Sequence, residues 1–116
     1  MVGSLNTFET PFSNLVTSQA GGTSLWQRGI PTGTLLNTTS SGVRVYGTNL
    51  SGNYTDGTKA YLYSQCYNFS QISNPVIRFK MAFDLETNWD ILYVQYSTDL
   101  GENWTVLGSA NDSNWY

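Results

Sequence analysis

The chain has 116 residues and a formal net charge of −3, and only 11% of its residues are charged, whereas a typical soluble domain carries roughly 25%. It contains no histidine, which excludes Ser-His-Asp and Cys-His catalysis by these residues and removes the commonest zinc and copper ligand. Five Lys and Arg residues are too few for a nucleic-acid surface, and no apolar stretch approaches the roughly 20 residues of a membrane span.

The composition favours an all-β fold. Aromatic residues make up 15% of the chain, which excludes intrinsic disorder for most of it, and β-favouring residues far outnumber helix formers. Short apolar or alternating runs recur between Gly, Asn, Ser and Asp clusters, as in an antiparallel two-sheet sandwich. We expect one module over residues 1–116, with strands at residues 5–9, 25–29, 43–48, 60–63, 76–85, 91–97 and 104–108.

The run at residues 76–85 has the clearest alternation. Its odd-numbered positions are large and apolar, and the positions between them include Arg78 and Lys80. This pattern predicts a half-buried antiparallel strand that pairs with residues 91–97 across a turn at residues 86–89. The side chains expected in the core are Phe79, Met81, Phe83, Leu92, Val94 and Trp104.

Residues 97–104 match the Ser-x-Asp-x-Gly-x-x-Trp pattern of an Asp-box, with Ser97, Asp99, Gly101 and Trp104 at the defining positions. An aspartate can accept hydrogen bonds from the amides of its own turn, and a glycine can adopt a positive φ. The pattern therefore predicts a hairpin in which Trp104 packs back against the root. A single copy is interpreted as structural rather than catalytic.

The carboxylates offer two kinds of site. Asp84 and Glu86 could share a strand end as a glycosidase pair, although neighbouring carboxylates in a turn are usually solvated. A calcium site assembled from distant loops is the better hypothesis, because Asp, Glu, Asn and carbonyl oxygens suit that ion. Glu9 and Asp90 have no basic partner nearby in the sequence, which makes them the lone carboxylates to consider.

Tryptophan and tyrosine in predicted loops are candidate sugar-binding platforms, since their flat apolar faces can stack on a sugar ring. Trp89 and Tyr54 meet this description, and packing is the alternative role for each. Cys66 is the only cysteine, so no internal disulfide is possible, and we expect it to be buried as a small hydrophobe.

Several segments, in order along nearly the whole chain, resemble a known module. They are Phe8-Glu9, Trp26-Gln27-Arg28-Gly29-Ile30-Pro31, Thr48-Asn49-Leu50-Ser51-Gly52-Asn53-Tyr54, Tyr61-Leu62-Tyr63-Ser64, Asn74-Pro75-Val76-Ile77-Arg78-Phe79, Trp89-Asp90 and the Asp-box. The module is the bacterial jelly-roll accessory domain that is similar to MAM domains and to the domains beside immune-inhibitor-A-type metalloproteases. It is common in secreted surface proteins of type IX-secreting bacteria.

The resemblance implies a concanavalin-like jelly roll, often calcium-bound, on a secreted or cell-surface protein. It places calcium ligands at Glu9, Asn49 and Asp90. The family domain usually continues beyond residues 114–116 through strands that close the two sheets. The chain is therefore expected to be a fragment, a short variant, or a module that pairs its open edges with another chain.

These observations lead to one main functional interpretation and two alternatives. The main one is a non-catalytic extracellular β-sandwich with structural calcium that contributes to cell-surface adhesion or to binding of a polysaccharide. The first alternative is a purely structural spacer or assembly domain. The second is an ancillary domain of a secreted hydrolase whose catalytic residues lie elsewhere in the parent chain.

Overall fold

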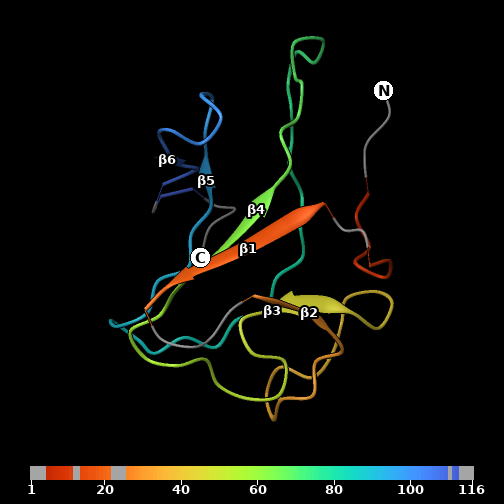
Figure 1. Ribbon diagram of the computed structural model, residues 1–116, viewed down its shortest axis with the longest axis vertical. Coiled ribbons are helices and arrows are strands. Elements are labelled where there is room, and N and C mark those ends of the chain that lie inside the picture. Colours follow the sequence, from red (N-terminus) through yellow and green to blue (C-terminus); the bar gives the residue numbers. More distant parts are fainter. Residues whose placement is uncertain (1–4, 12–13, 22–25, 110, 113–116) are drawn as a thin grey trace. The chain divides into compact units, whose positions relative to one another are not determined.

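A computed structural model describes residues 5–11, 14–21, 26–109 and 111–112, and its strands form three small antiparallel sheets (Figure 1). Strand β1 (Leu15–Ala20) pairs with β4 (Lys59–Ser64), and β2 (Gln27–Gly29) pairs with β3 (Val45–Gly47). Strand β5 (Gln95–Tyr96) pairs with β6 (Thr105–Val106). No helix occurs in these ranges, so the all-β antiparallel prediction is confirmed there.

The contacts divide the chain into two compact units. The first unit, Met1–Asp84, contains the β1–β4 and β2–β3 sheets, and the second, Leu85–Tyr116, contains the β5–β6 hairpin. Within the described ranges no helix is long and apolar enough to cross a membrane.

The β1–β4 pair is the longest ladder, running in register from Leu15 opposite Ser64 to Ala20 opposite Lys59. Tyr61 and Tyr63 alternate along β4, so they lie on one face, where their rings stack with centroids 6.0 Å apart. The prediction at residues 60–63 is confirmed, with one further residue at each end. Strand β1 was not predicted because its sequence lacks an apolar alternation, and its six cross-strand pairs with β4 define it instead.

The β2–β3 pair is covered by Leu50. A Cβ at Gly29 would lie only 2.5 Å from Leu50 Cδ1, so the leucine approaches the sheet where glycine leaves room for it. The Thr32 amide donates to the Leu50 carbonyl at 2.6 Å and fixes the segment after β2. The predicted strands at 25–29 and 43–48 are thus present in shortened form, while residue 25 lies outside the described residues.

Two predicted strands are wrong. Residues 5–9 and 76–85 belong to no strand, and β5 pairs with β6 instead of with residues 76–85. The alternation at 76–85 determines which side chains share a face of an extended chain, but a ladder also needs a partner backbone. In the structure β6 is that partner, and the Asp-box segment at residues 97–104 connects it to β5.

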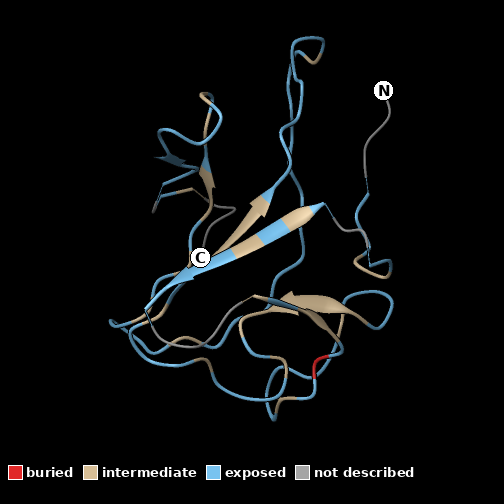
Figure 2. Cartoon of the chain, viewed as in Figure 1, coloured by how far each residue is buried: buried red, intermediate tan, exposed pale blue. Residues whose placement is uncertain are grey.

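The expected core is also wrong in its main members. Phe79, Met81, Phe83 and Trp104 are 53%, 41%, 41% and 43% exposed, whereas Leu92 and Val94 are half-buried. Among the described residues, no hydrophobic side chain is buried in a core. Pro31 is buried, and Figure 2 colours the buried class red. Phe79, Met81 and Phe83 lie outside the strands of the described residues, so no sheet packs them into a core. Cys66 is likewise exposed rather than buried.

Candidate functional site

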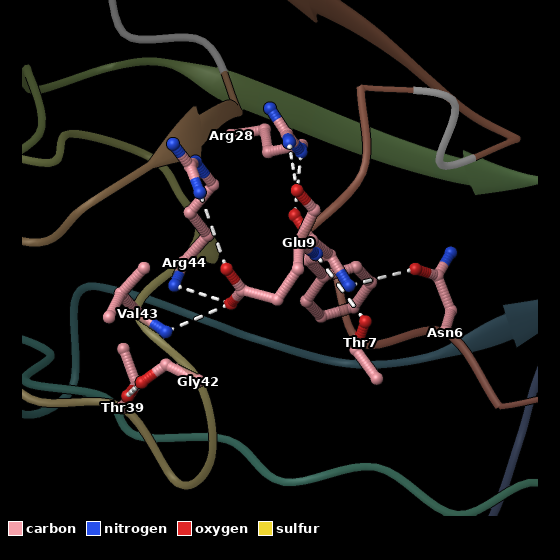
Figure 3. Close-up of polar contacts among 9 residues, drawn as sticks. Asn6, Thr7, Glu9, Arg28, Thr39, Gly42, Val43 and Arg44 are labelled. Atoms are coloured by element: carbon pink, nitrogen blue, oxygen red, sulfur yellow. Dashed lines mark hydrogen bonds and ion pairs between the residues drawn. The ribbon is translucent and has the colours of Figure 1, made fainter.

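In the first unit, the carboxylate of Glu9 holds a loop that lies far away in the sequence (Figure 3). Its Oε1 accepts hydrogen bonds from the backbone amides of Val43 and Arg44, both at 2.9 Å. Its Oε2 lies 3.3 Å from Arg44 Nη1 and completes an ion pair. We call Glu9 with residues 42–44 the Glu9 clamp.

Arg28 fixes the backbone that carries Glu9. From β2, its Nε donates to the Phe8 carbonyl at 2.7 Å and its Nη2 to the Glu9 carbonyl at 3.1 Å. The Phe8 ring meets the Tyr46 ring edge-on, with centroids 5.2 Å apart and planes at 84°. Tyr46 is the cross-strand partner of Arg28, so the β2–β3 sheet holds this segment through both a guanidinium and an aromatic ring.

Gly42 makes the clamp possible. Its φ is +63°, a conformation that L side chains adopt at a cost. A Cβ at this position would overlap Glu9 Oε1, so only glycine lets the carboxylate reach the two following amides. Thr39 supports the same loop, since its Oγ1 donates to the Gly42 carbonyl at 2.7 Å.

The surroundings of Glu9 favour its ionised form. The amides of Val43 and Arg44, followed by the Arg44 side chain, lower the pKa of the Glu9 carboxyl below its ordinary value of 4.5. These partners are all hydrogen-bond donors, and one is a cation, so they supply the positive charge that a calcium ion would otherwise bring. A calcium ion on Glu9 would have to replace Arg44 at Oε2.

The other two predicted calcium ligands each close a turn of their own. Asn49 Oδ1 accepts from the amide and the hydroxyl of Ser51 at 3.1 and 3.2 Å, and its Nδ2 donates to the Asn53 carbonyl at 2.7 Å. Asp90 Oδ2 accepts from the Glu86 amide at 3.0 Å. In the part of the chain that is described, no three or more Asp, Glu or Cys side chains gather as they would around a metal ion. Calcium binding stays a prediction.

The two predicted ring platforms differ in exposure. Trp89 is 79% exposed and sits on a turn in which the amides of Trp89 and Asp90 both donate to the Glu86 carbonyl at 3.1 Å. Asn88 in this turn has a φ of +69°. The turn therefore presents the Trp89 ring to solvent. Tyr54, in contrast, is half-buried in the first unit.

The Asp-box is a hairpin turn, as predicted, and joins β5 to β6. Ser97 Oγ donates to Asp99 Oδ1 at 2.7 Å and accepts from the Gly101 amide at 2.8 Å. Asp99 accepts from the Asn103 amide at 2.9 Å and from its Nδ2 at 2.7 Å. These donors, with the Ser97 hydroxyl the largest cause, lower the pKa of Asp99 from 3.8 to about 2.

Trp104 closes this turn rather than a hydrophobic core. Its Nε1 donates to the Gly101 carbonyl at 3.0 Å, and its ring lies over Gly101, where a Cβ would be 3.5 Å from Cζ2. Gly101 has a φ of +95°. The Asp-box therefore stabilises a loop, which is the structural role expected for a single copy.

Sequence reasoning named Glu9 but missed the residues that hold it. The sequence marks Glu9 as a lone carboxylate because no basic residue stands near it along the chain, yet Arg44 reaches it from 35 positions away. Gly42 stands directly before the alternating residues 43–46, which indicates a turn. This position does not indicate that a distant carboxylate binds to the turn. Arg28 lies in a segment that carried the family resemblance, without an assigned role.

Taken together, the described residues form an all-β antiparallel protein in which the best-connected carboxylates hold loops. No protein-family model and no solved structure matches the chain. The chain is 34% identical over 110 residues to Bacillopeptidase F of Bacillus subtilis (strain 168). The match covers 93% of this chain but 8% of that protein, so the chain spans a small part of the length of this curated relative.

Proposed function

We propose that the chain is a non-catalytic accessory module of a larger extracellular hydrolase. The observation that carries the proposal is the alignment of almost the whole chain with a small part of a protein named as a peptidase. The all-β antiparallel architecture and the resemblance to accessory jelly rolls support the same conclusion. A two-sheet sandwich completed by further strands is the fold we propose for the module as a whole.

The chemistry of the side chains supports a non-catalytic role. Without histidine, the chain lacks the usual base for a serine or cysteine nucleophile. A general acid or base works best with a pKa near the operating pH, whereas Glu9 and Asp99 have pKa values shifted downward, away from neutrality. Their oxygens are also engaged with amides, Arg44 and Asn103 of the surrounding loops.

The proposal implies a longer hydrolase that contains this chain, and the test is to delete the module from that hydrolase. Removing residues 5–112 should leave hydrolysis of a short soluble peptide within about twofold of the parent, because the reacting groups lie elsewhere. The purified 116-residue chain should show no turnover of the same substrate. Loss of short-peptide hydrolysis on deletion, or turnover by the isolated chain, would contradict the proposal.

Binding of a glycan is a second candidate function, supported by the 79% exposure of Trp89 on a hydrogen-bonded turn. A flat exposed indole can stack on an uncharged sugar ring while amide side chains bind its hydroxyls. Titration calorimetry against algal and plant polysaccharides should show binding that Trp89→Ala abolishes. Tyr93→Ala is the matched control, since Tyr93 is an exposed aromatic residue, 51% accessible, in the same unit. No binding by the wild type, or equal binding by Trp89→Ala, would reject this platform.

Structural calcium remains a proposal that rests on the family resemblance and on the loop positions of Glu9, Asn49 and Asp90. A ligand that binds only the native state raises its stability. Thermal unfolding in calcium should therefore occur several degrees higher than in chelator, and Glu9→Gln should reduce that difference. Identical curves would remove calcium from the account while leaving the accessory-module proposal intact.

A further inference from the structure

The longest run of consecutive exposed residues among those described is residues 73–84. Every residue in this range is exposed, and no strand pairing in the described ranges includes it. Its apolar side chains are prominent, because Ile77, Phe79 and Met81 are 60%, 53% and 41% exposed. Exposed apolar stretches with an extended pattern are places where a second polypeptide can add a strand.

The alternation gives this stretch two chemically different faces. When the stretch is extended as a β-strand, Ile77, Phe79, Met81 and Phe83 share one face, and Arg78, Lys80, Ala82 and Asp84 share the other. Arg78, Lys80 and Asp84 make no ion pair within the described residues. The stretch therefore carries two cations near its start and one carboxylate at its end. When two copies run antiparallel, the cations of one copy lie near the carboxylate of the other.

Antiparallel pairing of two copies places residue i opposite a residue j with a constant sum of i and j. When Met81 faces its own counterpart, Arg78 lies opposite Asp84 twice, once in each direction. In the same register Phe79 lies opposite Phe83 twice, and Lys80 lies opposite Ala82. Opposite charges and aromatic pairs directly across an antiparallel ladder are the favourable combinations.

Neighbouring registers fit less well. Centring the pairing on Lys80 places the two lysine cations directly opposite each other, which is unfavourable. Centring it on Ala82 requires Glu86 and Thr87 to continue the ladder. The Glu86 amide and carbonyl are instead engaged in the turn with Asp90 and Trp89.

We propose that residues 77–85 form the two-fold interface of a homodimer, in which two copies of this chain pair antiparallel about Met81. The partner is a second copy because the stretch supplies its own complementary charge and its own complementary apolar face. A two-fold interface of this kind is self-complementary and closed, so it yields dimers rather than filaments.

The test uses charge reversal on the intact 116-residue chain, with mass measured by sedimentation from low micromolar to several hundred micromolar protein. The wild type should dimerise. Arg78→Asp places two carboxylates opposite each other, and Asp84→Arg places two guanidinium groups opposite each other. Each single variant should dimerise about tenfold or more weakly, since two attractive pairs become repulsive.

An equimolar mixture of the two single variants is the decisive sample. Pairing one Arg78→Asp copy with one Asp84→Arg copy restores opposite charges at both positions, so the mixture should dimerise at close to wild-type strength. The double variant should do so as well. Lys80→Glu is the matched control, because Lys80 faces Ala82 in this register, and it should dimerise like the wild type.

Circular dichroism of each variant checks that the single substitutions leave the fold intact. A monomeric wild type would overturn the proposal, as would dimers insensitive to both single reversals. The Met81-centred register would also be rejected if Lys80→Glu lost its dimers and the mixture of Arg78→Asp and Asp84→Arg did not recover them. Of the registers compared above, the Ala82-centred one places Lys80 opposite Asp84. Aggregates that grow with concentration in all variants would show nonspecific association and overturn the closed dimer.

Discussion

Two carboxylates, one in each unit, are held by similar donors but differ in how far away those donors lie along the chain. Glu9 receives amide hydrogen bonds from residues 34 and 35 positions away. Asp99 is bound by groups two and four positions away. In both cases the donors lower the pKa of the carboxyl. The two sites are therefore chemically alike, but they differ in the length of chain between the carboxylate and its donors.

The difference teaches where each site gets its stability. Closing a longer loop costs more conformational entropy, and the Glu9 clamp forms only when β2, β3 and the loop at residue 42 are in place. The Asp99 turn needs only its own hairpin. Glu9 therefore reports the folding of the first unit, and Asp99 reports local structure.

The largest effect is expected at the glycine of the clamp. Gly42→Ala combines a positive φ with a Cβ that overlaps Glu9 Oε1, and it should lower the free energy of unfolding by roughly 3 kcal/mol. The control is Gly57→Ala, where φ is +67° but a Cβ meets nothing within 4 Å. It should cost about 1–2 kcal/mol from backbone strain alone. Urea unfolding measures both, and equal losses would mean that the carboxylate contact contributes nothing.

The next effect separates the two arginines of this region. Arg28→Met removes the bonds to the Phe8 and Glu9 carbonyls and should destabilise the first unit by about 1–3 kcal/mol. Arg44→Met leaves both amide bonds to Glu9 in place and removes only a partly solvated ion pair, so its cost should be smaller. Thermal unfolding of the two variants gives the comparison. A larger loss for Arg44→Met would mean that the ion pair, and not the backbone, holds the clamp.

A smaller effect is expected from acid at the Asp-box. The pKa of Asp99 is lowered from 3.8 to about 2 in the folded protein. The stabilisation from ionised Asp99 is therefore complete above the unfolded value and is lost as the pH falls from 3.8 to about 2. Asp99→Asn should weaken the pH dependence of β5–β6 hairpin stability in this window.

Asp56→Asn is the control for that measurement, because Asp56 is an exposed turn carboxylate in the other unit. Hydrogen exchange of the Leu107 amide, which donates to the Val94 carbonyl, follows the hairpin directly. A hairpin equally acid-sensitive in wild type and Asp99→Asn would assign the pH dependence to another group.

The sequence predicts structure well where the interacting groups are close together. The Asp-box was predicted because Ser97, Asp99 and Gly101 lie within one turn, and β4 was predicted to within one residue at each end. The failures involve distant partners. Strand β1 exists through pairing with β4, and Arg44 reaches Glu9 from 35 positions away in the sequence.

The run at residues 76–85 fails for a related reason. Its alternation predicts which side chains would share a face of an extended strand, but it carries no information about what covers that face. The expected burial of Phe79 and Met81 assumed a covering layer, and both are exposed. Burial depends on the partner surface as well as on the pattern.

The most direct test is an NMR titration of the Glu9 and Asp99 carboxyl carbons in the wild type and in Gly42→Ala. The account predicts a Glu9 pKa below 4.5 and an Asp99 pKa of about 2 in the wild type. In Gly42→Ala, the Glu9 pKa should return toward its ordinary value while Asp99 stays unchanged, because only the long-range clamp is broken. A Glu9 carboxyl that titrates at its ordinary value in the wild type, or that ignores the substitution, would contradict the clamp.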